Sequence, residues 1–287
     1  MNSIDIESKK FLGQPKNFVS IFNALLFDGQ QVLKSEYLKD ENSELVMNVS
    51  SKHVDIIKRY EDGTYLDLFV IESQSYVDPS MVARVMEYES VARMRYIRQN
   101  FKKHVPMHTR LPMILTVVLY VGESKWNAAK RLSELEIIHP GFEDMFNEFK
   151  LNLIELNTNH KYNTGEKATQ DFFDLLRMIY RKQILKEDLD REFNRDALYF
   201  AYVVTKNKEL LNIYQESEKG DVKVCRALDE MFEESTNKGI QMGIKQGIEL
   251  NQFEVYQTML DKGFSVKDIA SIFSVSEESI KTLLMRT

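Results

Sequence analysis

The sequence has 287 residues, of which 43% are hydrophobic and 29% are charged, with 11 glycines, 5 prolines and a single cysteine, Cys225. This composition excludes disordered, collagen-like and disulfide-stabilised proteins. The net charge of -6 argues against a surface that is basic throughout. The lone cysteine and the polar first ten residues predict a cytoplasmic protein. The longest apolar run, residues 111–121, is about half the ~20 residues that a membrane helix needs, so we expect no membrane association.

The first half of the chain predicts an α/β unit. Its apolar runs alternate between the helical period and the strand period, and all five prolines lie within it. The Asp62-Gly63 pair between two strand-like runs is typical of a β-hairpin. We therefore expect a mixed sheet flanked by helices, built from a helix at 18–27 that ends at Asp28-Gly29, strands at 54–60 and 64–74, a helix at about 79–103 with Pro79 in its first turn, and strands at 113–121 and 151–156.

The second half predicts helices, because apolar residues recur at three-to-four spacing over 169–185, 196–214 and 222–232. Three glycines at spacing four, at 239, 243 and 247, precede two short helices at 266–273 and 277–285, for which Ser265 and Ser276 are the expected N-caps. We expect an α/β domain at 1–160, a helical region at 161–235 and a small helical tail at 236–287. Small residues four apart allow close helix contact, so a homo-oligomer formed through the tail is one interpretation.

Two carboxylates of the predicted hairpin are candidates for a metal site. With a two-residue turn, Glu61 pairs with Thr64, and Asp55 lies opposite Val70. Asp55, Glu72 and Gln74 then share one face of the sheet, with the Cα atoms of the two acids ~7 to 8 Å apart. Mg²⁺ prefers such oxygen ligands and supports phosphodiester hydrolysis. The alternative is that these are ordinary solvent-facing acids of a strand.

The segment from Met81 to Arg110 is basic, with seven arginines and lysines against two acids. On a helix at 100° per residue, four of them fall within about 60° of one another, beside an apolar band. This arrangement can hold a phosphate backbone next to the carboxylates, although a solvated charged face is the simpler interpretation. The predicted DNA-binding residues are Arg84, Arg95, Arg98 and Lys102.

Several segments together resemble the recombination-promoting nuclease/putative transposase family (YhgA-like transposases), a branch of the PD-(D/E)XK nuclease superfamily. They are Phe22 to Gly29 (FNALLFDG), Asp55, Ile71 to Ser75 (IESQS), Asp78 to Tyr88 (DPSMVARVMEY), Val118 to Gly122 (VLYVG) with Trp126, and the glycine-spaced tail. The resemblance implies a restriction-endonuclease-like fold, a divalent cation and DNA cleavage.

Carried over residue by residue, the resemblance makes Asp55 and Glu72 the metal-binding acids and places Gln74 where the superfamily usually has lysine. Arg84 and Tyr88 match a recurrent pair on the following helix. The first helix has Ser20 and Asn23 where a further acid would be expected. The leading hypothesis is a Mg²⁺-dependent DNA endonuclease with Asp55, Glu72 and Gln74 as catalytic residues. The alternatives are a catalytically weak or inactive DNA-binding or regulatory protein on the same fold, and a purely structural oligomerising protein.

Overall fold

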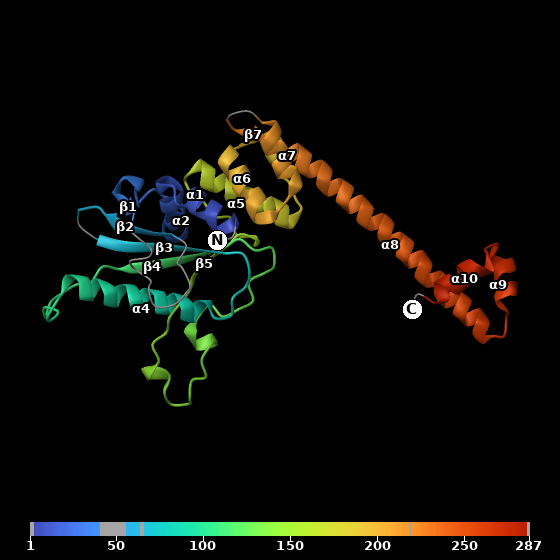
Figure 1. Ribbon diagram of the computed structural model, residues 1–287, viewed down its shortest axis with the longest axis horizontal. Helices are drawn as coiled ribbons and strands as arrows, with labels where there is room; N and C mark the ends of the chain where they lie inside the picture. Colours follow the sequence, from blue (N-terminus) through green and yellow to red (C-terminus); the bar gives the residue numbers. More distant parts are fainter. Residues whose placement is uncertain (1–2, 41–55, 64–65, 218–219, 286–287) are drawn as a thin grey trace. The chain divides into compact units, whose positions relative to one another are not determined.

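The computed structural model describes residues 3–40, 56–63, 66–217 and 220–285 (Figure 1). The chain divides into two compact units, Met1–Leu228 and Asp229–Thr287. The first unit contains both the sheet and the helices that follow it, so the predicted boundary near residue 160 falls inside one compact unit. Among the helices of these described ranges, none is long and apolar enough to cross a membrane.

The first unit is built on a mixed five-stranded sheet of order β1-β2-β3-β4-β5. The first three strands are antiparallel neighbours, and the last three are parallel neighbours. This arrangement confirms the predicted α/β fold, a mixed sheet flanked by helices and followed by a helical C-terminal region. The strands are β1 (Leu38–Asp40), β2 (Ile56–Glu61), β3 (Leu66–Gln74), β4 (Ile114–Tyr120) and β5 (Asn152–Glu155).

The hairpin register differs from the predicted one by two residues. Glu61 pairs with Leu66 rather than with residue 64, and Val70 pairs with Ile57 rather than with residue 55. Four residues, 62–65, therefore separate the strands, and the two-residue turn was wrong. Because a shift of two positions preserves the alternation of side chains, Val70, Glu72 and Gln74 keep their common face.

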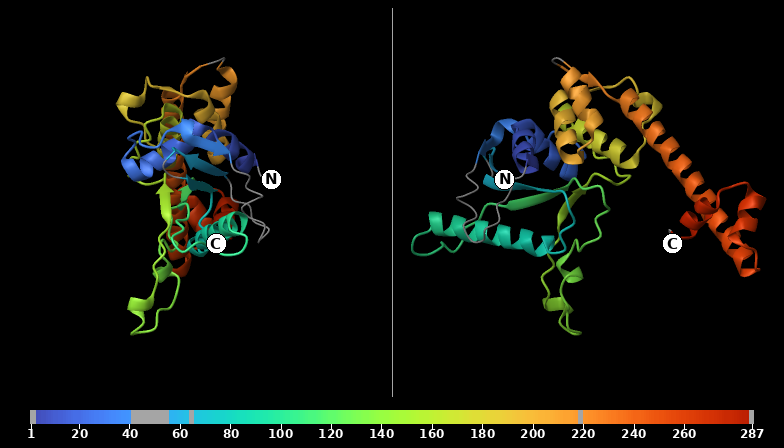
Figure 2. Two further views of the ribbon diagram at one scale, coloured as in Figure 1. Left: turned by 90° about the vertical axis from the view of Figure 1, so that its left-hand side faces the viewer. Right: turned by 45° about the vertical axis from the view of Figure 1, so that its right-hand side comes forward.

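Helices cover both faces of the sheet (Figure 2). On one face lies α2 (Pro15–Phe27), where the rings of Phe22 and Phe69 stack at 4.7 Å. On the other lies α4 (Met81–Asn100), whose Tyr88 joins a buried cluster with Val70 of β3. The helix α4 starts after Ser80, so Pro79 precedes the N-cap and does not occupy the first turn as predicted.

The remaining helices of the first unit pack beyond the sheet. α1 (Ser3–Leu12) contacts α6 (Arg195–Thr205), and Phe11, Phe172 and Phe200 form an aromatic cluster between these two helices and α5 (Lys167–Arg181). The predicted stretch 196–214 is two helices, because Lys206 adopts a left-handed conformation (φ 56°) and the side chain of Asn207 caps the next helix. The other described elements are α7 (Lys208–Glu216), the strand pair β6 (Glu192–Phe193) and β7 (Val222–Lys223), and 3-10 turns at Ser35–Tyr37, Leu132–Glu134, Glu143–Met145 and Lys186–Asp188.

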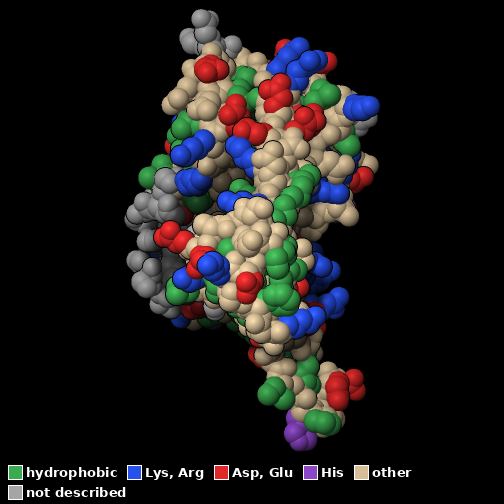
Figure 3. Space-filling view, turned by 90° about the vertical axis from the view of Figure 1, so that its right-hand side faces the viewer, with side chains coloured by type: hydrophobic (Ala, Val, Ile, Leu, Met, Phe, Trp, Pro, Cys, Tyr) green, Lys and Arg blue, Asp and Glu red, His purple; other side chains and the backbone are tan. Residues whose placement is uncertain are grey.

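A long connection between β4 and β5, residues 121–151, projects from the first unit. Hydrophobic side chains gather at its free end beside acidic and histidine side chains (Figure 3). Ile137 is fully exposed and Met145 is 75% exposed, and with Phe142 and Phe146 they line a cavity of about 500 Å³. Nothing among the described residues covers this apolar tip.

The second unit consists of the C-terminal part of α8 (Cys225–Asp261) with α9 (Val266–Phe273) and α10 (Glu277–Leu284). Its small core contains Tyr256, Ile269 and Ile280. The predicted N-caps are confirmed: Ser265 forms a capping box with Asp268, and the side chain of Ser276 accepts from the backbone N–H of Ser279.

Candidate active site

The candidate site lies at the C-terminal end of β3, on the sheet face that α4 covers. Glu72 and Gln74 lie two residues apart on this strand, so they share the face of Val70, which packs beneath Tyr88. Each of the two polar residues is only 4% exposed. Buried polar side chains at the end of a central strand need partners, and their partners define the site.

The partner of Glu72 is Arg84, one turn into α4. The Nη2 atom of Arg84 donates to Oε1 of Glu72 at 2.9 Å, and its Nη1 atom donates to Oδ2 of Asp78 at 2.5 Å. The Nε and Nη2 atoms also donate to the hydroxyl of Tyr88, at 3.1 and 2.9 Å. The Arg84 side chain is 13% exposed. The guanidinium group therefore joins two carboxylates and a phenol below the surface.

Asp78 ties the loop after β3 to the start of α4. Its Oδ1 atom accepts from the backbone N–H and the hydroxyl of Ser80, at 2.8 and 2.7 Å. Burial raises the pKa of Asp78, but the hydrogen bonds from Ser80 and Arg84 outweigh burial and lower the pKa overall. Burial lowers the pKa of Arg84, but its bonds to Asp78 and Tyr88 and the charge of Glu72 outweigh burial and raise the pKa overall. Arg84 thus stays protonated in this acidic setting.

Gln74 is the second buried polar side chain of the site. Its Nε2 atom is buried and has no hydrogen-bond partner within the described part of the chain. Its backbone carbonyl accepts from the N–H of Val121, which extends the pairing of β3 with β4. A buried donor without a partner costs about 1 to 3 kcal/mol, so this amide is suited to bind a group that approaches from outside.

The remaining predicted ligand positions differ in what the structure describes. Asp55 lies outside the described residues. On α2, the Asn23 side chain donates to the backbone carbonyl of Leu33 and accepts from its N–H, both at 2.9 Å. The hydroxyl of Ser20 hydrogen-bonds the carbonyl of Asn17 and the hydroxyl of Thr169, both at 2.8 Å. The two side chains therefore link α2 to α5 and to the backbone at Leu33. Within the described residues, no group of three histidine, cysteine or acidic side chains can hold a metal ion.

The predicted basic residues fall into two groups. Arg84 is enclosed by its acidic partners, whereas Arg98 lies exposed in the last turn of α4 and Arg95 is half-buried one turn earlier. Lys102 is exposed and lies beyond the end of the helix at Asn100, so its predicted place on the helical face was wrong. Over the described ranges, Arg95, Arg98 and Lys102 form no ion pair, which leaves their charges available to solvent.

Asp78 is the residue that sequence reasoning missed. It stands two residues before Ser80, the N-cap of α4, and its side chain accepts from the backbone N–H of that residue, a local bond that aspartate commonly makes two positions along the chain. A sequence signal could have identified Asp78. It is an acid just before a helix start, followed six residues later by an arginine on the helix face toward the same strand end. Its absence from the prediction made Arg84 look more available than it is.

Comparison with known proteins identifies the chain. The family described as "Putative transposase, YhgA-like" matches residues 5–210, more than half of the sequence. The chain belongs to this family. No curated protein and no solved structure matches it. The YhgA-like match spans the whole sheet, α4 and every candidate site residue, and it ends within α7.

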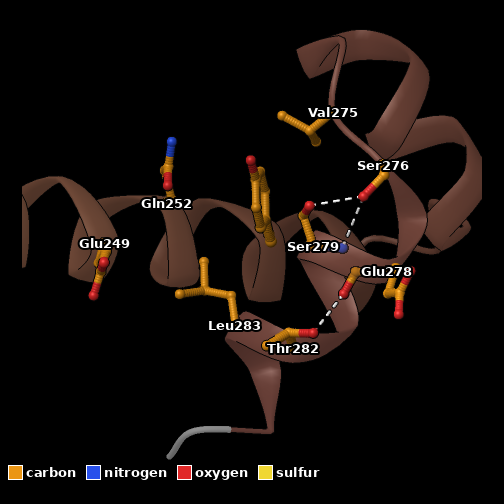
Figure 4. Close-up of a pocket in the computed structure, with 9 residues that line it drawn as sticks. Glu249, Gln252, Val275, Ser276, Glu278, Ser279, Thr282 and Leu283 are labelled. Carbon is orange, nitrogen blue, oxygen red and sulfur yellow. Dashed lines mark hydrogen bonds between the residues drawn. The ribbon is translucent and has the colours of Figure 1, made fainter.

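Outside the YhgA-like match, the second unit carries a pocket of about 440 Å³ between α8 and α10 (Figure 4). Two acids, Glu249 and Glu278, line it, together with Ser276, Ser279 and Thr282. The hydroxyls serve local structure: those of Ser276 and Ser279 bond each other at 2.7 Å, and that of Thr282 donates to the backbone of Glu278. The acids disfavour a phosphate ligand, and the hydroxyls already bond groups of α10 or of its N-cap Ser276.

Proposed function

We propose that this YhgA-like protein is a metal-dependent DNA endonuclease that hydrolyses phosphodiester bonds. The observation that carries the proposal is the pair of buried side chains at the end of β3. They are the carboxylate of Glu72 and, beside it, the amide of Gln74, whose Nε2 atom has no hydrogen-bond partner among the described residues. A buried acid next to an unsatisfied amide on a central strand is expensive for stability. Such a cost is typical of sites kept for chemistry.

The chemistry of these residues fits a hard divalent cation such as Mg²⁺. Glu72 would hold it through a carboxylate, and Asp55 is the second proposed ligand. The two acids directly adjoin the paired residues Ile56 and Ile71 in the sequence. A bound Mg²⁺ would supply an activated water and offset charge on the phosphoryl oxygens.

Gln74 contributes a hydrogen bond to that site. Its amide is neutral, so it cannot offset charge as a lysine would, but its Nε2–H can donate to a phosphate oxygen or orient a water molecule. Arg95, Arg98 and Lys102 would contact the DNA backbone, because their charges are not consumed by ion pairs with described residues. Neutralising phosphate charge is the main source of sequence-independent DNA affinity.

A second function, DNA binding without cleavage, is favoured by one specific observation. Arg84 already provides Glu72 with a cationic partner at 2.9 Å, so the acid is stabilised without any metal. A protein that had lost cleavage could retain this arrangement for structural reasons. The same assay separates the two functions.

The test is cleavage of supercoiled plasmid DNA with Mg²⁺ by the full chain and by Glu72→Gln. The matched control is Glu155→Gln, because Glu155 is almost as buried as Glu72, lies on β5 and accepts from the backbone N–H of Trp126 at 2.7 Å. We expect Glu72→Gln to lose at least about 100-fold in rate, since metal-assisted stabilisation is worth several kcal/mol. Glu155→Gln should keep cutting, with circular dichroism to verify folding. DNA binding without cleavage by the unchanged protein would instead support the second function.

A further inference from the structure

We infer that Arg84 is a positioning residue that fixes the carboxylate of Glu72 at the end of β3, and that it does not contact DNA. The inference rests on the proposed function for its catalytic consequence, but its structural part stands on the contacts alone. Arg84 donates to Glu72, Asp78 and Tyr88 at distances of 2.5 to 3.1 Å.

The three acceptors of Arg84 come from three different segments. Glu72 belongs to β3, Asp78 to the connecting loop, and Tyr88 to α4 one turn beyond the arginine itself. A guanidinium group is planar and presents its donors in a fixed fork, so three acceptors held at once define its position and theirs. Arg84 thereby holds the strand end, the loop and the helix in one relative position, and this position sets the orientation of the Glu72 carboxylate.

Lysine cannot reproduce this arrangement. An ammonium group is a point charge on a flexible stem, and it lacks the coplanar donors that reach Glu72 and Asp78 from two separate nitrogens. The Arg84→Lys change therefore keeps the charge and removes the geometry. It separates a positioning role, which needs the fork, from an electrostatic role, which needs only the charge.

The enclosure of Arg84 argues against a DNA contact. Its side chain is 13% exposed, and the two carboxylates it bonds lie at 2.5 and 2.9 Å. A phosphate could reach this guanidinium only by displacing an acid, which would break the ion pair of Arg84 with a buried carboxylate. Arg98, exposed on the same helix, offers a phosphate the same charge without that cost.

The first experiment tests the structural part without metal or DNA. Urea unfolding in EDTA is measured for the full chain, Arg84→Lys, Glu72→Gln and the double variant. We expect the two changes to be non-additive by roughly tenfold in the unfolding equilibrium constant, as for residues that share a network. The matched control cycle is Arg93→Lys with Glu89→Gln, a pair on the same helix whose arginine is 40% exposed and makes one side-chain hydrogen bond to a described residue. Its coupling should be smaller, and an additive Arg84–Glu72 cycle would overturn the inference.

The second experiment tests the role of Arg84 in function. The rate of plasmid cleavage is measured as a function of DNA concentration. Mn²⁺ binding is measured by titration calorimetry, and DNA affinity is measured at several salt concentrations. We expect Arg84→Lys to lower kcat at least tenfold and weaken Mn²⁺ binding, with KM and the salt dependence of DNA binding unchanged. A raised KM and a shallower salt dependence with kcat unchanged would make Arg84 a DNA contact. If the unchanged protein cuts no DNA, the proposed endonuclease fails, while the unfolding cycle and the salt dependence still decide the role of Arg84.

Discussion

Neutralising Arg95 and Arg98 should weaken the dependence of DNA affinity on salt. Both residues lie in the second half of α4, Arg98 is exposed, and neither forms an ion pair with a described residue. Each phosphate contact contributes about -0.9 to the slope of log affinity against log salt, so loss of two contacts should reduce the slope by about 1.8. Between 50 and 200 mM salt, the unchanged protein should therefore lose roughly twelvefold more affinity than Arg95→Gln/Arg98→Gln.

The assay is fluorescence anisotropy with a labelled duplex at four or more salt concentrations, in EDTA so that no cleavage occurs. The matched control is Lys9→Gln/Lys10→Gln, which removes the same charge from α1, a helix that packs against α6. The control should keep the slope of the unchanged protein. Equal slopes for Arg95→Gln/Arg98→Gln and the unchanged protein would remove α4 from the DNA-binding face. An equal decrease in both double variants would show that net charge alone governs binding.

Three further predictions concern stability. Arg191→Met should lower the free energy of unfolding by about 3 kcal/mol, because Arg191 pairs with two buried aspartates that each keep one other cation. Arg226→Met, which breaks a pair that is 71% exposed on both sides, should change it by less than about 1 kcal/mol, and equal effects in urea unfolding would contradict the role of burial. Deleting residues 236–287 should leave the melting temperature of the first unit within a few degrees by calorimetry, whereas outright unfolding would make the tail part of its core. Burial and the nearby Glu123 charge raise the pKa of Tyr180 above its value in the unfolded chain. The contribution of its neutral hydroxyl to the free energy of unfolding is therefore fully present below pH of about 10 and is lost as the pH rises further. In alkaline melts Tyr180→Phe should flatten this loss, and an unchanged pH profile would contradict the prediction.

Local patterns were sufficient for most of the elements. The N-caps Ser265 and Ser276 were correctly predicted because a cap depends on hydrogen bonds to residues two or three positions away. The common face of Glu72 and Gln74 was equally predictable, since strand side chains alternate with a period of two. Both features are fixed by neighbours in the chain, so no tertiary information was needed.

The hairpin register could not be predicted from the same patterns. A shift of two residues leaves every side chain of β2 and β3 on its original face, so the predicted and the observed pairings bury the same residues. The Asp62-Gly63 pair favoured the shorter turn. Tertiary packing favours the longer turn. In the observed register the ring centroids of Tyr60 and Phe69 lie 5.5 Å apart, and the Phe69 ring stacks on Phe22 of α2.

The role of Arg84 was decided by tertiary structure alone. The helical wheel correctly placed it on α4, but a wheel shows only the direction of a side chain and not what lies there. Two acids from outside the helix, Glu72 on β3 and Asp78 in the loop, meet at this point and enclose the guanidinium. The sequence by itself determined the strand, the helix and the charges, whereas the exposure of each charge depends on which distant groups the fold brings to it.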